Sequence, residues 1–390
     1  MPTWIPALVL FVLGLPAAPG VGQAQDRIYV SLQGQAGVAV VDAATFEEVA
    51  RVDLTELGFS ANASPHHTAV DPDGSHWYVS LITENRVVKF DRENRMVGQA
   101  ELTAPGLMVR DPSGPWLYVA RSMMAADPPR SVGRIHTGTM EVEEMDVFFP
   151  RPHAVALAPG QDRIFSASLS QNQMGSLQVE TLEMGLTNLD GPIHTVVQVA
   201  VSPDESTLVA TGELTGRLLV FDLTSPDAPQ LRHSVEVGSG PWHPVFEPDG
   251  ARVWMGLKGA DQVVAVDVMT GEVVERISHP AFHGPHGALI RPDGRYLFLS
   301  SSGPGGMEVG QTLAGGAHHG MHHGDPNHHP DHDHRPDPGH DPAHAHGPEA
   351  TDPDEVRSVG TLSVIDLSTA EVVRVLEMGR NTTGIGMRPW

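Results

Sequence analysis

The chain has no cysteine among its 390 residues. This absence excludes disulfide bonds, thiolate metal ligands, a cysteine nucleophile and lipid attachment through a thioether. Aromatic residues make up only 5%, whereas 41 glycines and 33 prolines interrupt the chain at short intervals. No long apolar segment with a helical period of 3.6 follows residue 24. The composition therefore predicts an all-β protein built from short strands.

Positive charge is also scarce, because the formal net charge is −24. Nucleic acids and anionic membrane surfaces both need a cationic footprint on the protein that binds them. We therefore expect neither as a partner, and metal cations are the natural counter-ligands of this chain.

Sequence motifs of common catalytic sites are missing too. The chain has no G-x-S-x-G nucleophile elbow and no H-E-x-x-H pair of a zinc protease. The glycine-rich stretch 302–310 does not qualify as a phosphate loop, because no helix is expected after it. These absences favour a binding protein over an enzyme without deciding the question.

Residues 1–24 predict a signal peptide. The apolar run 4–18 has about the length of a signal-peptide core, and small residues follow it up to Ala24. A membrane anchor is the alternative, but the run is short for a span and contains two prolines. We favour secretion and expect a periplasmic or secreted protein that inserts no segment into a membrane after the signal peptide is cleaved.

A phrase of two apolar strands around a Pro-Asp-Gly type of turn recurs about once every 45 residues. Its six copies begin at Pro65, Pro105, Arg151, Val197, Pro241 and Gly284. Each copy continues into two further apolar strands, for example over 86–102 and 262–277. Four antiparallel strands that cannot bury their apolar face alone and must stack on neighbouring units form one blade of a β-propeller.

The two ends of the chain predict a seventh blade. Strands over 26–31 and 37–54 lack a first strand, and the strand over 381–390 stands alone at the C-terminus. Joining them closes the ring and removes exposed sheet edges. We predict a single seven-bladed β-propeller domain over 25–390, closed by pairing the C-terminal strand with the N-terminal blade.

Several of these phrases resemble the YVTN-repeat, YncE-like family of secreted bacterial β-propellers. They are DRIYVS at 26–31, VAVVDAATFEEVARVDL at 38–54, HWYVS at 76–80 and VVAVDVMTGEVVERI at 263–277. The resemblance covers nearly the whole chain after the leader except one insertion. It implies a secreted β-propeller and says little about function, because one architecture hosts many activities.

Histidines recur near the start of the first strand of the repeats. Counted back from the proline of each turn, they lie five, six or nine residues earlier. The seven are His66, His67, His153, His194, His243, His283 and His286. Because the first strand of each blade lines the central channel, we expect all seven to start from the same rim of that channel. Two blades contribute none, since Gly106 and Leu107, and Thr383 and Gly384, stand at those positions.

Converging histidines favour a metal site. Neutral imidazole is the commonest protein metal ligand, and with no lysine or arginine nearby the channel is predicted to hold a divalent transition metal, copper or zinc. The alternative is that each histidine only forms hydrogen bonds with backbone groups at a strand start. The sequence leaves both interpretations open.

A histidine-rich insertion over 303–358 separates the second and third strands of the last blade, and it holds 11 of the 22 histidines. Proline, glycine, histidine and aspartate at this density cannot bury apolar surface, so we expect disorder and several labile metal sites. The predicted ligands are His318, His319, His322, His323, His328, His329, His332, His334, His340, His344 and His346. The connection between strands two and three of a blade emerges on the face where strand one begins. The insertion is therefore expected to capture metal ions over the channel mouth.

The favoured function is a monomeric, periplasmic or secreted metal-binding β-propeller that buffers or hands on copper or zinc. One alternative is a metal-dependent enzyme at the hub, either a lactonase-like hydrolase or a copper oxidase. The other is a protein-interaction scaffold in which the histidine tract is incidental. No protein partner can be named from the sequence.

Overall fold

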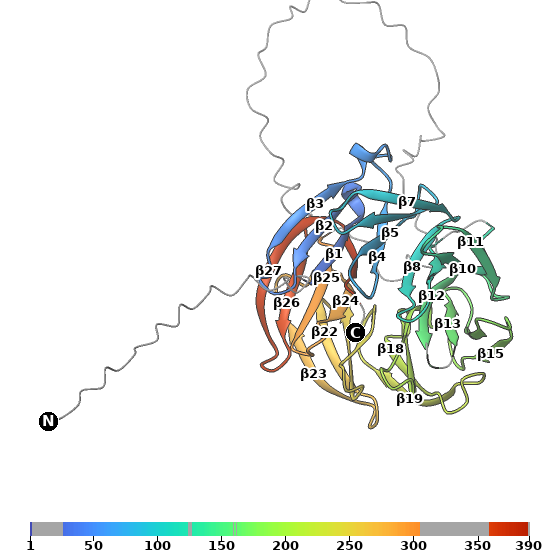
Figure 1. Cartoon of the computed structure of the whole chain (residues 1–390). Coiled ribbons are helices and arrows are strands. Elements are labelled where there is room, and N and C mark those ends of the chain that lie inside the picture. Colours follow the sequence, from blue (N-terminus) through green and yellow to red (C-terminus); the bar gives the residue numbers. More distant parts are fainter. Residues whose placement is uncertain (2–25, 124–126, 159, 161, 305–358, 389–390) are drawn as a thin grey trace, which may run out of the picture.

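The computed structural model describes residues 1, 26–123, 127–158, 160, 162–304 and 359–388. Within these residues the strands form seven four-stranded antiparallel sheets, arranged as blades in a ring (Figure 1). The predicted all-β, seven-bladed fold is therefore confirmed. All but the first residue of the predicted signal peptide (1–24) and nearly all of the predicted insertion (303–358) lie outside the described residues.

The blades follow one another in chain order around the ring, and the strands of each blade are ordered from the innermost to the outermost. Blade 1 is β28 (Thr382–Gly386), β1 (Arg27–Leu32), β2 (Gly37–Asp42) and β3 (Glu48–Asp53), and blade 2 is β4 (Pro65–Val70), β5 (His76–Leu81), β6 (Arg86–Asp91) and β7 (Met96–Glu101). Blade 3 is β8 (Pro105–Arg110), β9 (Trp116–Arg121), β10 (Ser131–His136) and β11 (Val142–Asp146), and blade 4 is β12 (Pro152–Ala158), β13 (Arg163–Ser168), β14 (Gln173–Gln178) and β15 (Met184–Asn188). Blade 5 is β16 (Val196–Val201), β17 (Thr207–Gly212), β18 (Arg217–Asp222) and β19 (Gln230–Glu236), and blade 6 is β20 (Val245–Phe246), β21 (Arg252–Leu257), β22 (Gln262–Asp267) and β23 (Glu272–Ser278). Blade 7 is β24 (Pro285–Ile290), β25 (Tyr296–Ser301), β26 (Val359–Asp366) and β27 (Glu371–Arg380), and two short 3-10 helices, η1 (Gln33–Gln35) and η2 (Thr55–Leu57), complete the described elements.

The ring closes through the two ends of the chain, as predicted. The C-terminal strand β28 pairs antiparallel with β1, with Val30 opposite Ile385 and Tyr29 opposite Gly386. The strands of blade 1 consequently stand next to those of blade 7 at the other end of the sequence, blue beside red in Figure 1. This closure pairs the inner edge of β1, which the N-terminal segment alone would leave open.

The core lies between neighbouring blades rather than within any one of them. Trp77 of β5 stacks on Tyr29 of β1 and on Phe90 of β6, with ring centroids 4.6 and 4.1 Å apart. All six residues of β2 and of β17 are buried because both faces of these sheets pack against other blades. Outer strands such as β3 and β7 are mostly exposed. Each large apolar side chain buried in this way contributes roughly 1.5–3 kcal/mol to folding stability. A blade without its neighbours would lose much of this contribution, so we expect no blade to be stable alone.

The same backbone joint leads into the first strand of every blade. The residue before that strand has a left-handed conformation, with φ between 46° and 64°. Its carbonyl oxygen accepts a hydrogen bond of 2.7–3.2 Å from the N–H of the residue that follows the second strand. The seven pairs are Asn381 with Gln33, Ser64 with Ile82, Ala104 with Ser122, Arg151 with Leu169, Thr195 with Glu213, Gly240 with Lys258, and Gly284 with Ser302. This joint fixes the point at which the first strand of each blade enters the channel.

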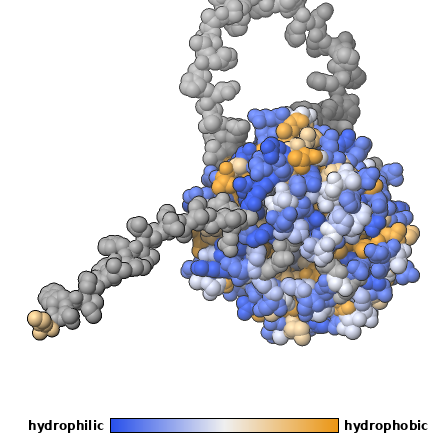
Figure 2. Space-filling view, viewed as in Figure 1, coloured by the Kyte–Doolittle hydropathy of each residue, from blue (hydrophilic) through white to orange (hydrophobic). Residues whose placement is uncertain are grey.

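The outer surface is consistent with the acidic composition. Figure 2 shows a mainly hydrophilic face with scattered apolar residues in the described part of the chain. Among the described residues, no helix is long and apolar enough to cross a membrane.

Candidate functional site

The channel side chains are best numbered from the left-handed residue of each joint. The second residue after it is His66, Gly106, His153, Val197, Trp242, His286 or Thr383 in blades 2 to 7 and 1. The third is histidine in two blades, namely His67 in blade 2 and His243 in blade 6. These two consecutive positions therefore bring imidazoles from four blades to one axis. We call His66, His67, His153, His243 and His286 the hub cluster.

The five rings of the hub cluster form a continuous series of contacts. The ring centroids of His153 and His66 lie 6.0 Å apart, and those of His66 and His286 lie 5.6 Å apart. The series continues from His286 to His243 at 5.0 Å and from His243 to His67 at 6.1 Å. His153 and His66 come within this distance although blade 3 lies between them, because that blade places only Gly106 at the equivalent position.

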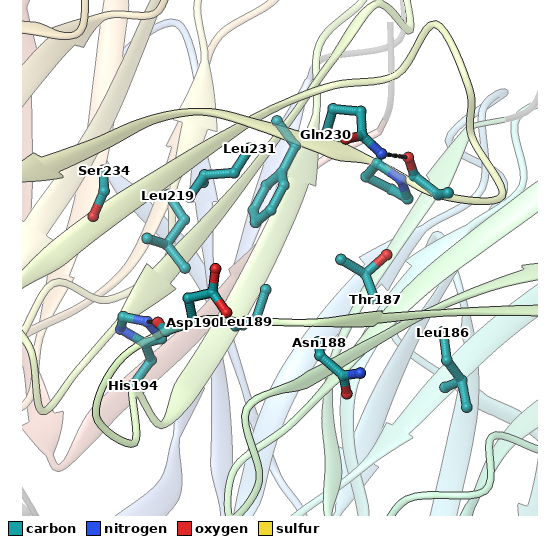
Figure 3. Close-up of a pocket in the computed structure, with 13 residues that line it drawn as sticks. Leu186, Thr187, Asn188, Leu189, Asp190, His194, Leu219, Gln230, Leu231 and Ser234 are labelled. Atoms are coloured by element: carbon teal, nitrogen blue, oxygen red, sulfur yellow. Dashed lines mark hydrogen bonds between the residues drawn. The ribbon is translucent and has the colours of Figure 1, made fainter.

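Two of the seven predicted channel histidines lie outside the hub cluster, so the seven side chains do not form one group. His194 and His283 precede the left-handed residues Thr195 and Gly284, so the joint turns the chain toward the channel only after them. The ring of His194 contacts the Thr215 hydroxyl at 2.8 Å and the Asp190 carbonyl at 3.0 Å. It lines a 360 Å³ groove beside β15 and β19 (Figure 3).

The His283 side chain is half exposed and lies 3.5 Å from a carboxylate oxygen of Asp261. Counting residues back from the turn could not separate these two from the others. A left-handed residue lies between the turn and each of these two histidines, and a count of residues does not show that the chain changes direction there.

Burial keeps the hub cluster uncharged. His153 is fully buried and His66, His243 and His286 are at most 5% exposed. Burial first, and repulsion by neighbouring imidazoles second, lower the pKa of His66, His243 and His286 well below the usual value. Burial lowers the pKa of His67 and of His153 to about 4. Near neutral pH each ring therefore carries one N–H and one lone pair.

The hydrogen bonds of the hub cluster show which nitrogens hold the lone pairs. His153 Nδ1 lies 2.7 Å from the Val197 carbonyl oxygen, which can only accept, so Nδ1 carries the proton and Nε2 the lone pair. Gln33 donates its amide N–H to Ser64 and thereby turns its oxygen toward His66 Nδ1 at 3.4 Å, which gives His66 the same tautomer. His67 is the opposite case, because its Nδ1 accepts the N–H of Met108.

Four ring nitrogens of the hub cluster are buried without a hydrogen-bond partner among the described residues. They are Nε2 of His66, His153 and His243, and Nδ1 of His286. A buried polar atom without a partner costs about 1–3 kcal/mol, so four of them in one cluster indicate a position that a ligand can complete. The interpretation that these histidines only hydrogen bond at strand starts accounts for Nδ1 of His153, but not for these four atoms.

The spacing of the rings suits a shared ion, although the donors do not yet converge. Two imidazoles that bind one tetrahedral ion through bonds of about 2 Å have ring centroids roughly 5 Å apart, close to the separations in the hub cluster. Among the described residues, however, no three His, Asp or Glu side chains are already arranged to hold a metal ion. Binding would therefore require some of the rings to rotate.

The hub cluster separates two cavities on the channel axis. His66 and His286 line a cavity of 270 Å³ at the end where the first strands begin, which we call the mouth cavity. His67 lines a cavity of 250 Å³ at the opposite end, beside the ends of β4, β8 and β24. The hub cluster is thus bordered by a cavity at each end of the channel.

Three other side chains at the hub were missed by the sequence analysis. Lys258 lines the mouth cavity, with its ammonium nitrogen 4.2 Å from the centroid of the Trp242 ring. Burial lowers the pKa of Lys258 to about 8, and attraction by the buried Glu213 opposes that effect. The expectation of no lysine or arginine near the channel histidines was therefore wrong. Lys258 and Glu213 directly follow the second strands of their blades, and this register, read along the repeats, would have found them.

The described ends of the histidine-rich insertion lie at the mouth cavity. Ser302, which directly follows β25, lines this cavity together with His66 and His286. Gly303 donates its N–H to the carbonyl of His283, and a Cβ on Gly303 would lie 2.8 Å from the Val359 carbonyl, where β26 begins. Both ends of the insertion therefore leave the ring on the face where the first strands start, as the topology predicted.

Comparison with known proteins supports the fold of this chain but assigns it to no family. No protein-family model matches the chain, and no curated protein matches it by sequence. Membership of the YVTN-repeat, YncE-like family consequently stays a prediction.

Solved structures resemble this fold at low sequence identity. A functionally unknown protein from Desulfotomaculum acetoxidans is 12% identical with a TM-score of 0.65, covering 93% of this chain and 98% of that one. The periplasmic gluconolactonase PpgL of Pseudomonas aeruginosa is 16% identical, with a TM-score of 0.62 and coverage of 93% and 99%. Apo AztD from Citrobacter koseri is 9% identical, with a TM-score of 0.58 and coverage of 93% and 98%. At this identity the likeness shows a shared fold.

Proposed function

We propose that this propeller is an exported, YncE-like metal-binding protein whose hub cluster holds one divalent transition-metal ion. The ligands would be Nε2 of His66, His153 and His243 and Nδ1 of His286. The observation that carries the proposal is that these four buried ring nitrogens lie in one cluster without partners among the described residues. Export and a periplasmic location rest on the leader sequence and agree with one structural neighbour, a periplasmic gluconolactonase.

The donor set favours zinc or copper(II). Neutral imidazoles suit zinc, copper and nickel, whereas calcium and magnesium require oxygen ligands, and the chain has no thiolate to select copper(I). The Nδ1 atoms of His153 and His66 face acceptor oxygens, as the outer nitrogens of metal-bound histidines usually do. These hydrogen bonds hold the rings of His153 and His66 in the tautomer that leaves Nε2 free to bind a metal.

The histidine-rich insertion would act as the capturing arm. Its histidines are tethered at the mouth cavity, so ions bound there would reach the hub cluster at a raised effective concentration. We propose buffering or transfer of the metal rather than catalysis, because the chain contains neither a G-x-S-x-G nucleophile elbow nor an H-E-x-x-H pair.

Thermal unfolding of untagged full-length protein with added zinc tests the hub site. An ion that binds the folded ring but not the unfolded chain stabilises the ring by about 2.7 kcal/mol when its concentration is 100-fold above Kd. Binding to the insertion alone would not. We expect zinc to raise the unfolding midpoint of the native protein but not that of a His66→Gln, His153→Gln double variant.

His283→Gln serves as the matched control, because it removes an exposed imidazole at the same face but outside the hub cluster. Metal content after dialysis, measured by mass spectrometry, should fall by one ion per chain in the double variant and stay unchanged in the control. Equal stabilisation of the native protein and the double variant by zinc would contradict the proposal.

A further inference from the structure

The mouth cavity contains a feature that metal binding does not use. The chain has only two lysines, Lys89 and Lys258, and Lys258 lies in the wall of this cavity. The Lys258 side chain is 7% exposed. A buried ammonium group is costly unless a charged or hydrogen-bonding partner compensates it, so its placement at a cavity calls for a partner.

The protein supplies that partner only in part. Among the described residues, the Lys258 ammonium lies over the Trp242 ring and is attracted by Glu213. Glu213 is not one of the residues that line the mouth cavity. Because an ammonium group carries three N–H donors, Lys258 can also donate to a molecule in the cavity that it lines.

The rest of the cavity wall defines what such a molecule would be. Among the described residues that line the cavity, Lys258 is the only formally charged one, so none of these residues repels an anion. Residues with hydroxyl or amide side chains also line the cavity, namely Ser64, Ser122, Ser302, Thr383, Gln33 and Asn381. Ile82 and Met123 add an apolar portion, which suits a short carbon chain.

Size and charge narrow the class further. A volume of 270 Å³ is slightly below that of typical drug-binding pockets and fits a molecule of about six to ten non-hydrogen atoms. One ammonium group, with Glu213 close by and a net charge of −24 on the chain, favours a single negative charge over two.

We propose that the mouth cavity binds a short-chain organic carboxylate, with the carboxylate held by Lys258 and the carbon chain against Ile82 and Met123. This site does not depend on a metal at the hub cluster. It is a second ligand site on the same axis, one layer nearer to the mouth.

Calorimetric titration of chelator-treated, full-length protein with sodium butyrate tests the site, with butyramide as its neutral isostere. We expect butyrate to bind at least tenfold more tightly than butyramide, and Lys258→Met to weaken butyrate binding at least tenfold. Lys258→Arg should retain part of the affinity. Lys89→Met is the matched control, because the amine of Lys89 donates to the Thr137 carbonyl away from the channel, and it should change nothing.

Isotope labelling gives a readout that needs no variant. Protein labelled with ¹³C-lysine has two sets of lysine signals, and butyrate should shift those of Lys258 and leave those of Lys89 in place. Unmoved Lys258 signals at saturating butyrate, or equal affinities for butyrate and butyramide, would overturn the proposal. Tighter binding of inorganic phosphate than of butyrate would overturn the carboxylate class. Because all titrations are made without metal, failure here would leave the metal site untouched.

Discussion

Acidification should destabilise this propeller through the hub cluster, and His153 allows the effect to be calculated. Burial lowers the pKa of His153 from 6.5 to about 4, and the side chain is completely buried. Between these two values the unfolded chain binds a proton that the folded ring does not. The stability that neutral His153 preserves is therefore complete above pH 6.5 and is lost as the pH falls toward 4.

The expected size follows from the shift. A difference of about 2.5 pKa units corresponds to roughly 3 kcal/mol, a large part of the stability of an ordinary domain. Replacing His153 by glutamine removes the proton-binding group. It also relieves the repulsion that His153 exerts on a protonated His66, which acts in the same direction.

Urea denaturation of the native protein and of His153→Gln, from pH 7 to pH 4 with a chelator present, measures the effect. The substitution costs packing and the bond to Val197 at every pH, so the informative quantity is the change in the difference between the two proteins. We expect the native protein to lose about 3 kcal/mol more than the variant over this range. A difference that stays constant with pH would refute the assignment of His153 as a buried neutral imidazole.

Three further changes test the backbone around the hub cluster and the role of the histidine-rich insertion. Gly284→Ala should cost about 1–2 kcal/mol in urea denaturation, because Gly284 has φ = 63° and only the backbone conformation opposes a Cβ there. Gly384→Ala should cost more, since its Cβ would lie 2.3 Å from the His66 carbonyl and push the closing strand β28 off blade 2; equal costs for the two would contradict this packing. Deletion of residues 317–346 should slow zinc loading of the hub in competition with a chromogenic chelator and leave the metal-free unfolding midpoint unchanged, whereas unchanged loading would separate the insertion from the hub.

The fold could be predicted because its signals are local and repeated. Each blade carries two apolar strands around a turn, and the unpaired strand at the C-terminus completes the only blade that lacks a first strand. Such a pattern survives divergence, because every blade must bury its faces against its neighbours. The sequence could equally predict that His66, His153 and His286 share a layer, since they occupy the same position relative to the turn.

The rest of the site depends on backbone conformations that residue counting does not reveal. His194 and His283 were predicted for the channel because they lie nine residues before the proline of a turn, near the start of a first strand. The structure shows that Thr195 and Gly284 turn the chain after them. In blade 6, Trp242 stands at the position that holds a histidine in blades 2, 4 and 7. Lys258 directly follows β21 and lines the mouth cavity. Neither position could be recognised by a search for histidines alone.

The two proposed ligands of the channel would influence each other. The ammonium group of Lys258 lowers the pKa of His66, His153, His243 and His286, and the same repulsion would oppose a cation bound by these rings. A carboxylate bound to Lys258 would neutralise that repulsion and strengthen metal binding. By linkage, metal at the hub would strengthen carboxylate binding by the same factor. The affinity of the hub for metal would then follow the occupancy of the mouth cavity. If the protein transfers metal ions as proposed, this coupling would control when it retains and when it releases them.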